Sequence, residues 1–215
     1  MNWNLQYEIN KNRIGETILY NVLCAMYDGR TDIKIENVAC DEECYHLGDI
    51  RITNSAGKIY YFDAKNDGRI NETGNVFCED YKKFYSNSQK IHSGFMRDGK
   101  YDILCVIDRI GSKIYFINFS KLKEIYKKYR FVGTELEDAI SYGYVVPISE
   151  IEKIGAMEMV VDYREVVIGD EIKIYYINPL LDNFLGGEKL CADRRIDSER
   201  KTILRRICSQ WRYRK

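Results

Sequence analysis

Proline is scarce in this chain, with only two in 215 residues. So few prolines leave little material for rigid linkers, and 18 tyrosines favour a β-containing globular domain. No apolar run approaches the length of a membrane span. The N-terminal sequence MNWNLQYEINKN is polar and does not have the pattern of a signal peptide. We therefore expect a cytoplasmic protein without a membrane partner.

An excess of either charge is also absent, because 33 Lys and Arg balance 33 Asp and Glu. A uniformly basic nucleic-acid-binding protein is thereby excluded, and any such surface must come from uneven distribution of charge. Residues 193–215 show that unevenness, with nine Lys or Arg against three acids. Trp211 and Tyr213 alternate there with arginines, which predicts base stacking and phosphate contacts. The alternative is a docked helix with solvated arginines. The arginines concerned are Arg205, Arg206, Arg212 and Arg214.

Several motifs of other enzyme classes are missing, namely a Gly-rich phosphate loop, a G-x-S-x-G turn and a plausible Cys–His dyad. The seven cysteines are scattered and odd in number, which indicates reduced thiols. Cys40, Cys44 and His46 have no second ligand pair, so we do not expect zinc there.

The most informative stretch is residues 48–65, GDIRITNSAGKIYYFDAK, in which two apolar runs flank a polar turn. This pattern predicts a β-hairpin whose second strand ends in Asp63-Ala64-Lys65. Because successive side chains on a strand point to opposite faces, Asp63 and Lys65 share one face. A second carboxylate beside this pair would complete a metal site.

Whether Asp49 supplies that carboxylate depends on the turn. Gly57 stands where a three-residue loop needs a left-handed residue, so we expect Asn54 to pair with Lys58. That register places Asp49 opposite Asp63 and on the same face. A two- or four-residue turn would instead direct Asp49 away.

An amphipathic helix is predicted over residues 13–27, because apolar residues recur at steps of three and four. Glu16 falls in its expected first turn. There its carboxylate would favour the positive end of the helix dipole, which is a structural alternative to any role in a site.

The succession of Glu16 on a helix, Asp49 on a strand, and Asp63-x-Lys65 on the next strand resembles the PD-(D/E)XK nuclease superfamily. The resemblance covers roughly residues 10–130. Gly48 stands where that pattern commonly has proline, and Asp63 where glutamate is more frequent. The resemblance implies a restriction-endonuclease-like fold and hydrolysis of phosphodiesters that leaves a 5′-phosphate.

The same resemblance implies a cofactor and roles for individual residues. Mg²⁺ or Mn²⁺ would be held by Asp49, Asp63, the backbone carbonyl of Ala64 and Glu16. Lys65 would orient the attacking water or stabilise developing charge. His46 is a further group that could reach the same site.

Residues 79–96 have helical composition, and we predict a helix there with partly free cationic side chains. The resemblance implies phosphate contacts on such a helix, whereas a solvated face is the alternative. The residues concerned are Lys82, Lys83, Gln89 and Lys90.

The remaining chain predicts strands over 101–107 and 113–119, a helix capped by Ser120, and three further strand-like runs after residue 131. The fold class is therefore α/β, with a mixed sheet flanked by helices and a β-rich C-terminal elaboration. The segments are a nuclease-like core at 1–130, the elaboration of the same domain at 131–192, and a basic tail at 193–215.

The leading hypothesis is a metal-dependent endonuclease acting on DNA in restriction, repair or junction processing. RNA as substrate and a homodimer as the functional state are left open. The rival is a non-catalytic module of the same fold that binds nucleic acid or protein. A third hypothesis treats Asp63-x-Lys65 as a chance surface pair.

Overall fold

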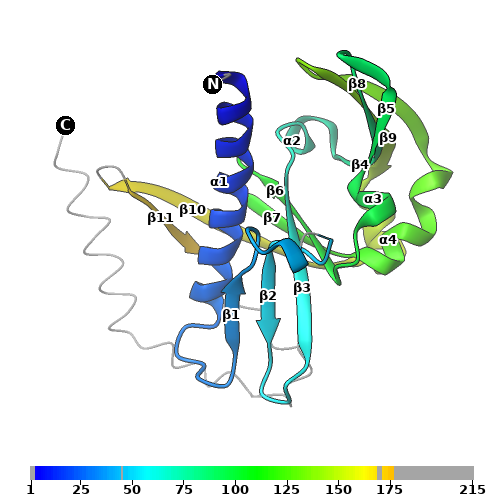
Figure 1. Cartoon of the computed structure of the whole chain (residues 1–215). Helices are drawn as coiled ribbons and strands as arrows, with labels where there is room; N and C mark the ends of the chain where they lie inside the picture. The colour runs from blue at the N-terminus through cyan, green and yellow to red at the C-terminus, as the bar shows by residue number, and fades with distance from the viewer. Residues whose placement is uncertain (1–2, 45, 169–170, 177–215) are drawn as a thin grey trace. The chain divides into compact units, whose positions relative to one another are not determined.

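The computed structural model describes the backbone of residues 3–44, 46–168 and 171–176, and the side chains of 14–44, 46–87 and 91–164. All described residues belong to the first compact unit of the chain, which spans 1–179. Figure 1 shows the elements of this first unit. The four tail arginines considered above lie outside the described residues.

The larger of two sheets has seven strands in the order β1-β2-β3-β6-β7-β10-β11. β3 and β6 are parallel and the other neighbours are antiparallel, so this is a mixed sheet in an α/β protein, as predicted. Its strands are β1 (Lys34–Asn37), β2 (Ile50–Thr53), β3 (Ile59–Asn66), β6 (Ile103–Asp108), β7 (Lys113–Asn118), β10 (Met157–Ile168) and β11 (Glu171–Tyr176).

A second, antiparallel sheet has four strands in the order β5-β4-β9-β8. Its strands are β4 (Asn75–Phe84), β5 (Asn87–Ser93), β8 (Arg130–Glu135) and β9 (Ala139–Pro147). The segment after residue 131 therefore contributes to both sheets, since β10 and β11 belong to the larger one.

The helix predicted over 79–96 was wrong, because β4, β5 and the single turn α3 (Phe95–Asp98) occupy that stretch. Burial along the first part of β4 alternates, with Val76, Cys78 and Asp80 buried and the residues between them half-buried. This period of two is the signature of a strand, and it outweighs helical composition. The lysines at 82 and 83 therefore lie on a strand.

The helix predicted over 13–27 is confirmed, but α1 runs from Trp3 to Met26. Ile18, Leu19, Val22 and Leu23 are fully buried, and the helix packs against β1, β3, β6 and β11. Glu16 therefore lies in the middle of the helix, where the favourable interaction with the N-terminal dipole does not apply.

Short helical segments complete the unit. α4 (Phe119–Ile125) is capped by Asn118, whose side chain accepts the Lys121 N–H, and not by Ser120 as predicted. The others are η1 (Glu42–Cys44), α2 (Ile70–Thr73), α5 (Ile148–Lys153) and η2 (Tyr126–Lys128). Within the described ranges no helix is long and apolar enough to span a membrane.

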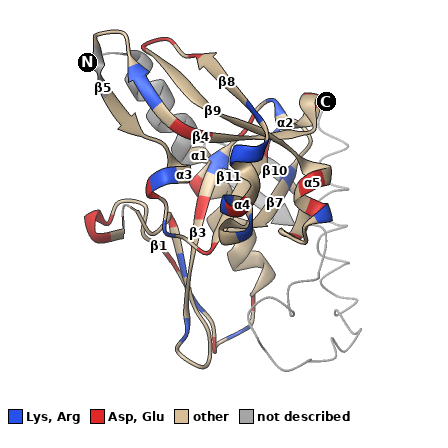
Figure 2. Cartoon of the chain, turned by 90° about the vertical axis from the view of Figure 1, so that its right-hand side faces the viewer, with Lys and Arg blue, Asp and Glu red and all other residues tan. Residues whose placement is uncertain are grey.

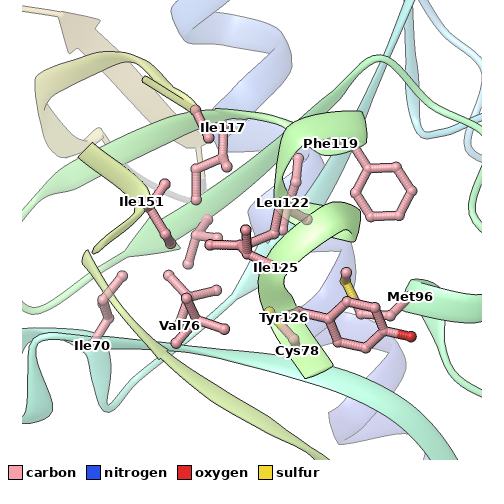
Figure 3. Close-up of a cluster of buried hydrophobic side chains, with 14 of the residues drawn as sticks. Ile70, Val76, Cys78, Met96, Ile117, Phe119, Leu122, Ile125, Tyr126 and Ile151 are labelled. Carbon is pink, nitrogen blue, oxygen red and sulfur yellow. The ribbon is translucent and has the colours of Figure 1, made fainter. Parts of the chain in front are cut away.

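A buried cluster joins the two sheets into one unit (Figure 3). Leu104 and Val106 from β6 meet Val76 and Cys78 from β4, and Leu122 of α4 packs among them. Burial of these side chains stabilises the arrangement by about 1.5–3 kcal/mol for each large aliphatic residue. The core thus fixes β3 and β6, whose ends carry the candidate site, relative to the second sheet.

Candidate active site

The hairpin formed by β2 and β3 has the predicted register. Ile50 pairs with Phe62 and Thr53 pairs with Ile59. The Asn54 N–H donates to the Lys58 carbonyl at 3.0 Å, and Gly57 has a φ of 75°. The three-residue turn expected from the sequence is therefore confirmed, and it fixes which side chains of β3 share a face.

Asp49 lies just beyond the last ladder pair, at a turn made by Gly48. Gly48 has a φ of 130°, and a Cβ there would come within 2.7 Å of the Phe62 carbonyl oxygen. The Asp49 N–H donates to that carbonyl at 2.8 Å, and its Oδ2 accepts the Ala64 N–H at 2.7 Å. Glycine at position 48 thus allows the close backbone approach that brings Asp49 to the backbone of β3.

Asp63 and Lys65 share a face at the end of β3, as predicted. The Lys65 Nζ lies 2.8 Å from Asp63 Oδ2, and Asp63 is only 7 % exposed. The same Nζ lies 5.7 Å from the centre of the Phe95 ring, in the range of a cation–π contact. The ammonium is therefore held between a carboxylate and an aromatic ring.

The three charged groups influence one another strongly. Burial raises the pKa of Asp63 to about 6, although the attraction of Lys65 opposes this rise. The negative charge of Asp49 adds to the rise. Burial also raises the pKa of Asp49, against the attraction of Lys65 and the Ala64 N–H, and Glu16 adds to that rise. Burial acts to lower the pKa of Lys65, but attraction to Asp63 and Asp49 outweighs it and raises that pKa. The negative charge here exceeds what one ammonium neutralises.

Glu16 approaches these groups from α1. The helix comes so close to β3 that a Cβ on Gly15 would lie 2.7 Å from the side-chain amide of Asn66. Glu16 is half-buried and borders the same cleft as Asp49 and Asp63. The structure thus brings Glu16, Asp49, Asp63 and Lys65 to one cleft, and the effect of Glu16 on the pKa of Asp49 reports their proximity.

The cleft has a volume of about 1090 Å³ and lies between the end of β3 and one face of the second sheet. Lys82 and Arg130 contribute to the wall formed by that sheet, and His46 also borders the space. Lys82 pairs with Glu79 at 3.2 Å. Acidic and basic segments thus occur together along β3 and β4 (Figure 2).

The other residues of this segment that were predicted to contact nucleic acid are Lys83, Gln89 and Lys90. Lys83 is the ladder partner of Ile140, whereas Lys82 is the partner of Ser141, so the two lysines occupy opposite faces of the sheet. The side chains of Gln89 and Lys90 lie outside the described residues.

The donor groups fit a hard divalent cation. Residues in a ladder direct their N–H and C=O toward the same edge of the strand. The Ala64 carbonyl therefore faces the edge where its N–H meets Asp49, beyond the end of β2. Two carboxylates and one carbonyl are the oxygen ligands that Mg²⁺ prefers. Across the described side chains, no three His, Cys, Asp or Glu groups are close enough to hold a metal by themselves.

Two aromatic residues of the site were missed from the sequence. Tyr101 is 6 % exposed and borders the cleft. Burial raises the pKa of its hydroxyl, and the charge of the nearby Asp63 carboxylate raises it further. Phe95 lies under Lys65. Both reach the site because β6 pairs in parallel with β3 and because α3 follows β5, and neither arrangement has a local sequence signal.

No protein-family model, curated protein or solved structure matches this chain.

Proposed function

We propose that the chain is a magnesium- or manganese-dependent endonuclease that hydrolyses phosphodiester bonds of DNA. The observation that carries the proposal is the Asp63–Lys65 pair at 2.8 Å, with Asp49 bonded to the intervening Ala64 N–H, on the wall of a cleft. Raised pKa values of two neighbouring carboxylates in a cleft, with that of Asp63 at about 6, are typical of a functional site.

Asp49, Asp63 and the Ala64 carbonyl would hold the cation, with Glu16 reaching it through water. Bound there, the cation would polarise the phosphate and lower the pKa of the attacking water. The excess negative charge described above supports this assignment, because a divalent cation would relieve it.

Lys65 has the geometry of a group that stabilises charge on the substrate. Its raised pKa keeps the side chain protonated at neutral pH, so it acts as a point cation. The Phe95 ring and Asp63 restrict the ammonium to the side of the cleft where a phosphate would bind. A pre-positioned cation needs no rearrangement as negative charge develops on the phosphate oxygens.

The opposite wall would position the substrate. Lys82 and Arg130 offer cations to neighbouring phosphates across the cleft from Lys65. Arg69, in the loop after β3, offers another. Such contacts fix the register of a nucleic-acid strand but carry no sequence information.

The rival function is a binding module that lacks catalysis. A module that bound only the backbone of nucleic acid would favour exposed cations, whereas this site retains two carboxylates whose raised pKa values show that their charge is costly. That arrangement favours catalysis over simple binding.

Cleavage of plasmid DNA by the purified full-length chain tests the proposal. Asp49→Asn removes a negative ligand with little change in volume, and we expect a loss of magnesium-dependent cleavage of about 100-fold or more. Asp98→Asn, at an exposed carboxylate on the same cleft, serves as the control and should retain the rate. Equal cleavage by the Asp49→Asn protein would contradict the proposal, as would a wild-type chain that binds DNA without cutting it.

A further inference from the structure

The face of the second sheet turned away from the cleft carries a set of aligned aromatic rings. Tyr81 and Tyr142, which pair across β4 and β9, stack with centroids 4.8 Å apart and planes 20° apart. Phe131 of β8 lies 6.1 Å from Tyr142 with the planes only 15° apart. Phe131 pairs in the ladder with Tyr144, and Phe131 is 44 % exposed. We call Tyr81, Tyr142 and Phe131 the aromatic face.

This arrangement extends beyond what the core requires. Tyr144 packs against the buried cluster, and the aromatic face continues from it toward the solvent. Gly133 pairs with Tyr142, and a Cβ there would lie 3.1 Å from the tyrosine ring. Because Gly133 has no side chain, the ring of Tyr142 lies across β8 at this position. The result is a flat aromatic surface next to an exposed ring.

Cations surround these rings. Lys83 Nζ lies 5.8 Å from the Tyr81 centroid and 5.7 Å from that of Tyr142. Arg97 lies 5.2 Å from the Tyr81 centroid and is held there by Asp80 at 2.6 Å. Besides Asp80, Glu135 lies on the same face, because its ladder partner Ile140 is also the partner of Lys83. Aligned rings with adjacent cations are complementary to a ligand that offers both planar groups and negative charge.

We propose that the aromatic face binds single-stranded nucleic acid, with an unpaired base stacking on Phe131 and phosphates meeting Lys83 and Arg97. A duplex hides the faces of its bases within the helix, so it offers these rings no partner. A second copy of this chain docked face to face would bring Lys83 and Arg97 against cations of the same sign, which disfavours self-pairing.

The short helix α3 connects the aromatic face to the cleft. Of the whole inference, only this connection rests on the proposed function. Phe95 lies under Lys65 in the cleft, while Arg97, two residues later, lies over Tyr81. A strand that leaves the cleft past α3 reaches the aromatic face directly. The inferred substrate class is therefore nucleic acid with an unpaired segment beside the cleaved bond.

Fluorescence anisotropy of the full-length chain in EDTA tests the binding without any cleavage. The probes are a labelled oligothymidine, an abasic oligonucleotide of equal length and a duplex of equal length. We expect oligothymidine to bind most tightly, and Phe131→Ala to weaken it by about 5-fold or more while leaving the abasic probe unchanged. Ile110→Ala, at an apolar side chain that is 62 % exposed between β6 and β7, is the matched control.

A second variant separates charge from stacking. Lys83→Gln should weaken both single-stranded probes and lower the magnitude of the salt slope by about 0.7. Unchanged oligothymidine affinity in folded Phe131→Ala would overturn the inference. So would equal affinity for the abasic probe, a preference for duplex, or self-association that Phe131→Ala abolishes with no change in DNA binding. A wild-type chain that passes this test but cuts no DNA would refute only the proposed function.

Discussion

The Asp63→Asn substitution should make the folded chain more stable at pH 8, because it removes a buried charge. Burial is the leading cause that raises the pKa of Asp63 from its ordinary 3.8 to about 6, and that value already includes the opposing attraction of Lys65. At pH 8 the raised pKa lowers the free energy of unfolding of the wild type by about 3 kcal/mol, because each pH unit between the two pKa values contributes about 1.4 kcal/mol. Asparagine resembles the protonated carboxyl in shape and charge.

The sign of the effect follows from the raised pKa. Below about pH 4 the carboxyl is protonated in the folded and the unfolded chain, so the substitution changes little. Between about pH 4 and pH 6 the unfolded chain loses the proton while the folded chain keeps it, and the stability of the wild type falls. Above pH 6 the folded chain holds the buried charge, and the advantage of the variant reaches its full size.

Urea unfolding followed by far-UV circular dichroism, at pH 4, 5, 6 and 8 without divalent metal, measures this difference. The Asp98→Asn protein carries the same substitution at an exposed carboxyl on the cleft and should change by less than about 0.5 kcal/mol throughout. The reasoning is refuted if Asp63→Asn brings no stabilisation at pH 8. A gain of equal size at pH 4 and pH 8 would refute it as well, because it would come from something other than charge.

Three further predictions concern the site and the tail. Lys65→Ala should abolish cleavage but keep calcium or manganese binding in calorimetry, since an ammonium is no ligand; loss of binding in the folded variant would assign Lys65 another role. Gly48→Ala should lower the free energy of unfolding, measured with urea, by about 1–3 kcal/mol, because its Cβ would meet the Phe62 carbonyl. This loss should exceed that of Gly57→Ala, whose Cβ would meet nothing within 4 Å, and equal losses would contradict the prediction. Replacing the basic tail charges should weaken DNA binding and flatten its salt slope while cleavage at saturating substrate stays unchanged, and an unchanged slope would show that the tail takes no part. The positions to replace are Arg205, Arg206, Arg212 and Arg214.

Local sequence rules predicted the part of the site that lies within one hairpin. Gly57 fixed the turn, the turn fixed the register, and the register placed Asp63 and Lys65 on one face. The position of Asp49 needed one more fact, the left-handed turn at Gly48. That turn follows from the close approach of the Phe62 carbonyl, which becomes visible only when β2 and β3 are paired.

The remaining fold depended on contacts between distant segments. The stretch after Glu79 contains good helix formers, yet it became a strand because β9 pairs along the whole of β4. Partners 60 or so residues apart leave no local signal, so composition favoured the wrong element. The same limit hid Tyr101 and Phe95, and with them the surroundings of Lys65.

The most direct test of the account is the position of a bound metal ion. Anomalous diffraction from crystals of the full-length chain soaked in manganese should show an ion about 2.1 Å from a carboxylate oxygen of Asp49, one of Asp63 and the Ala64 carbonyl. Crystals of Asp63→Asn should lack that ion. Manganese bound elsewhere in the wild type, or absent from this edge of β3 at millimolar concentration, would contradict the claim that these residues form a metal-dependent nuclease site.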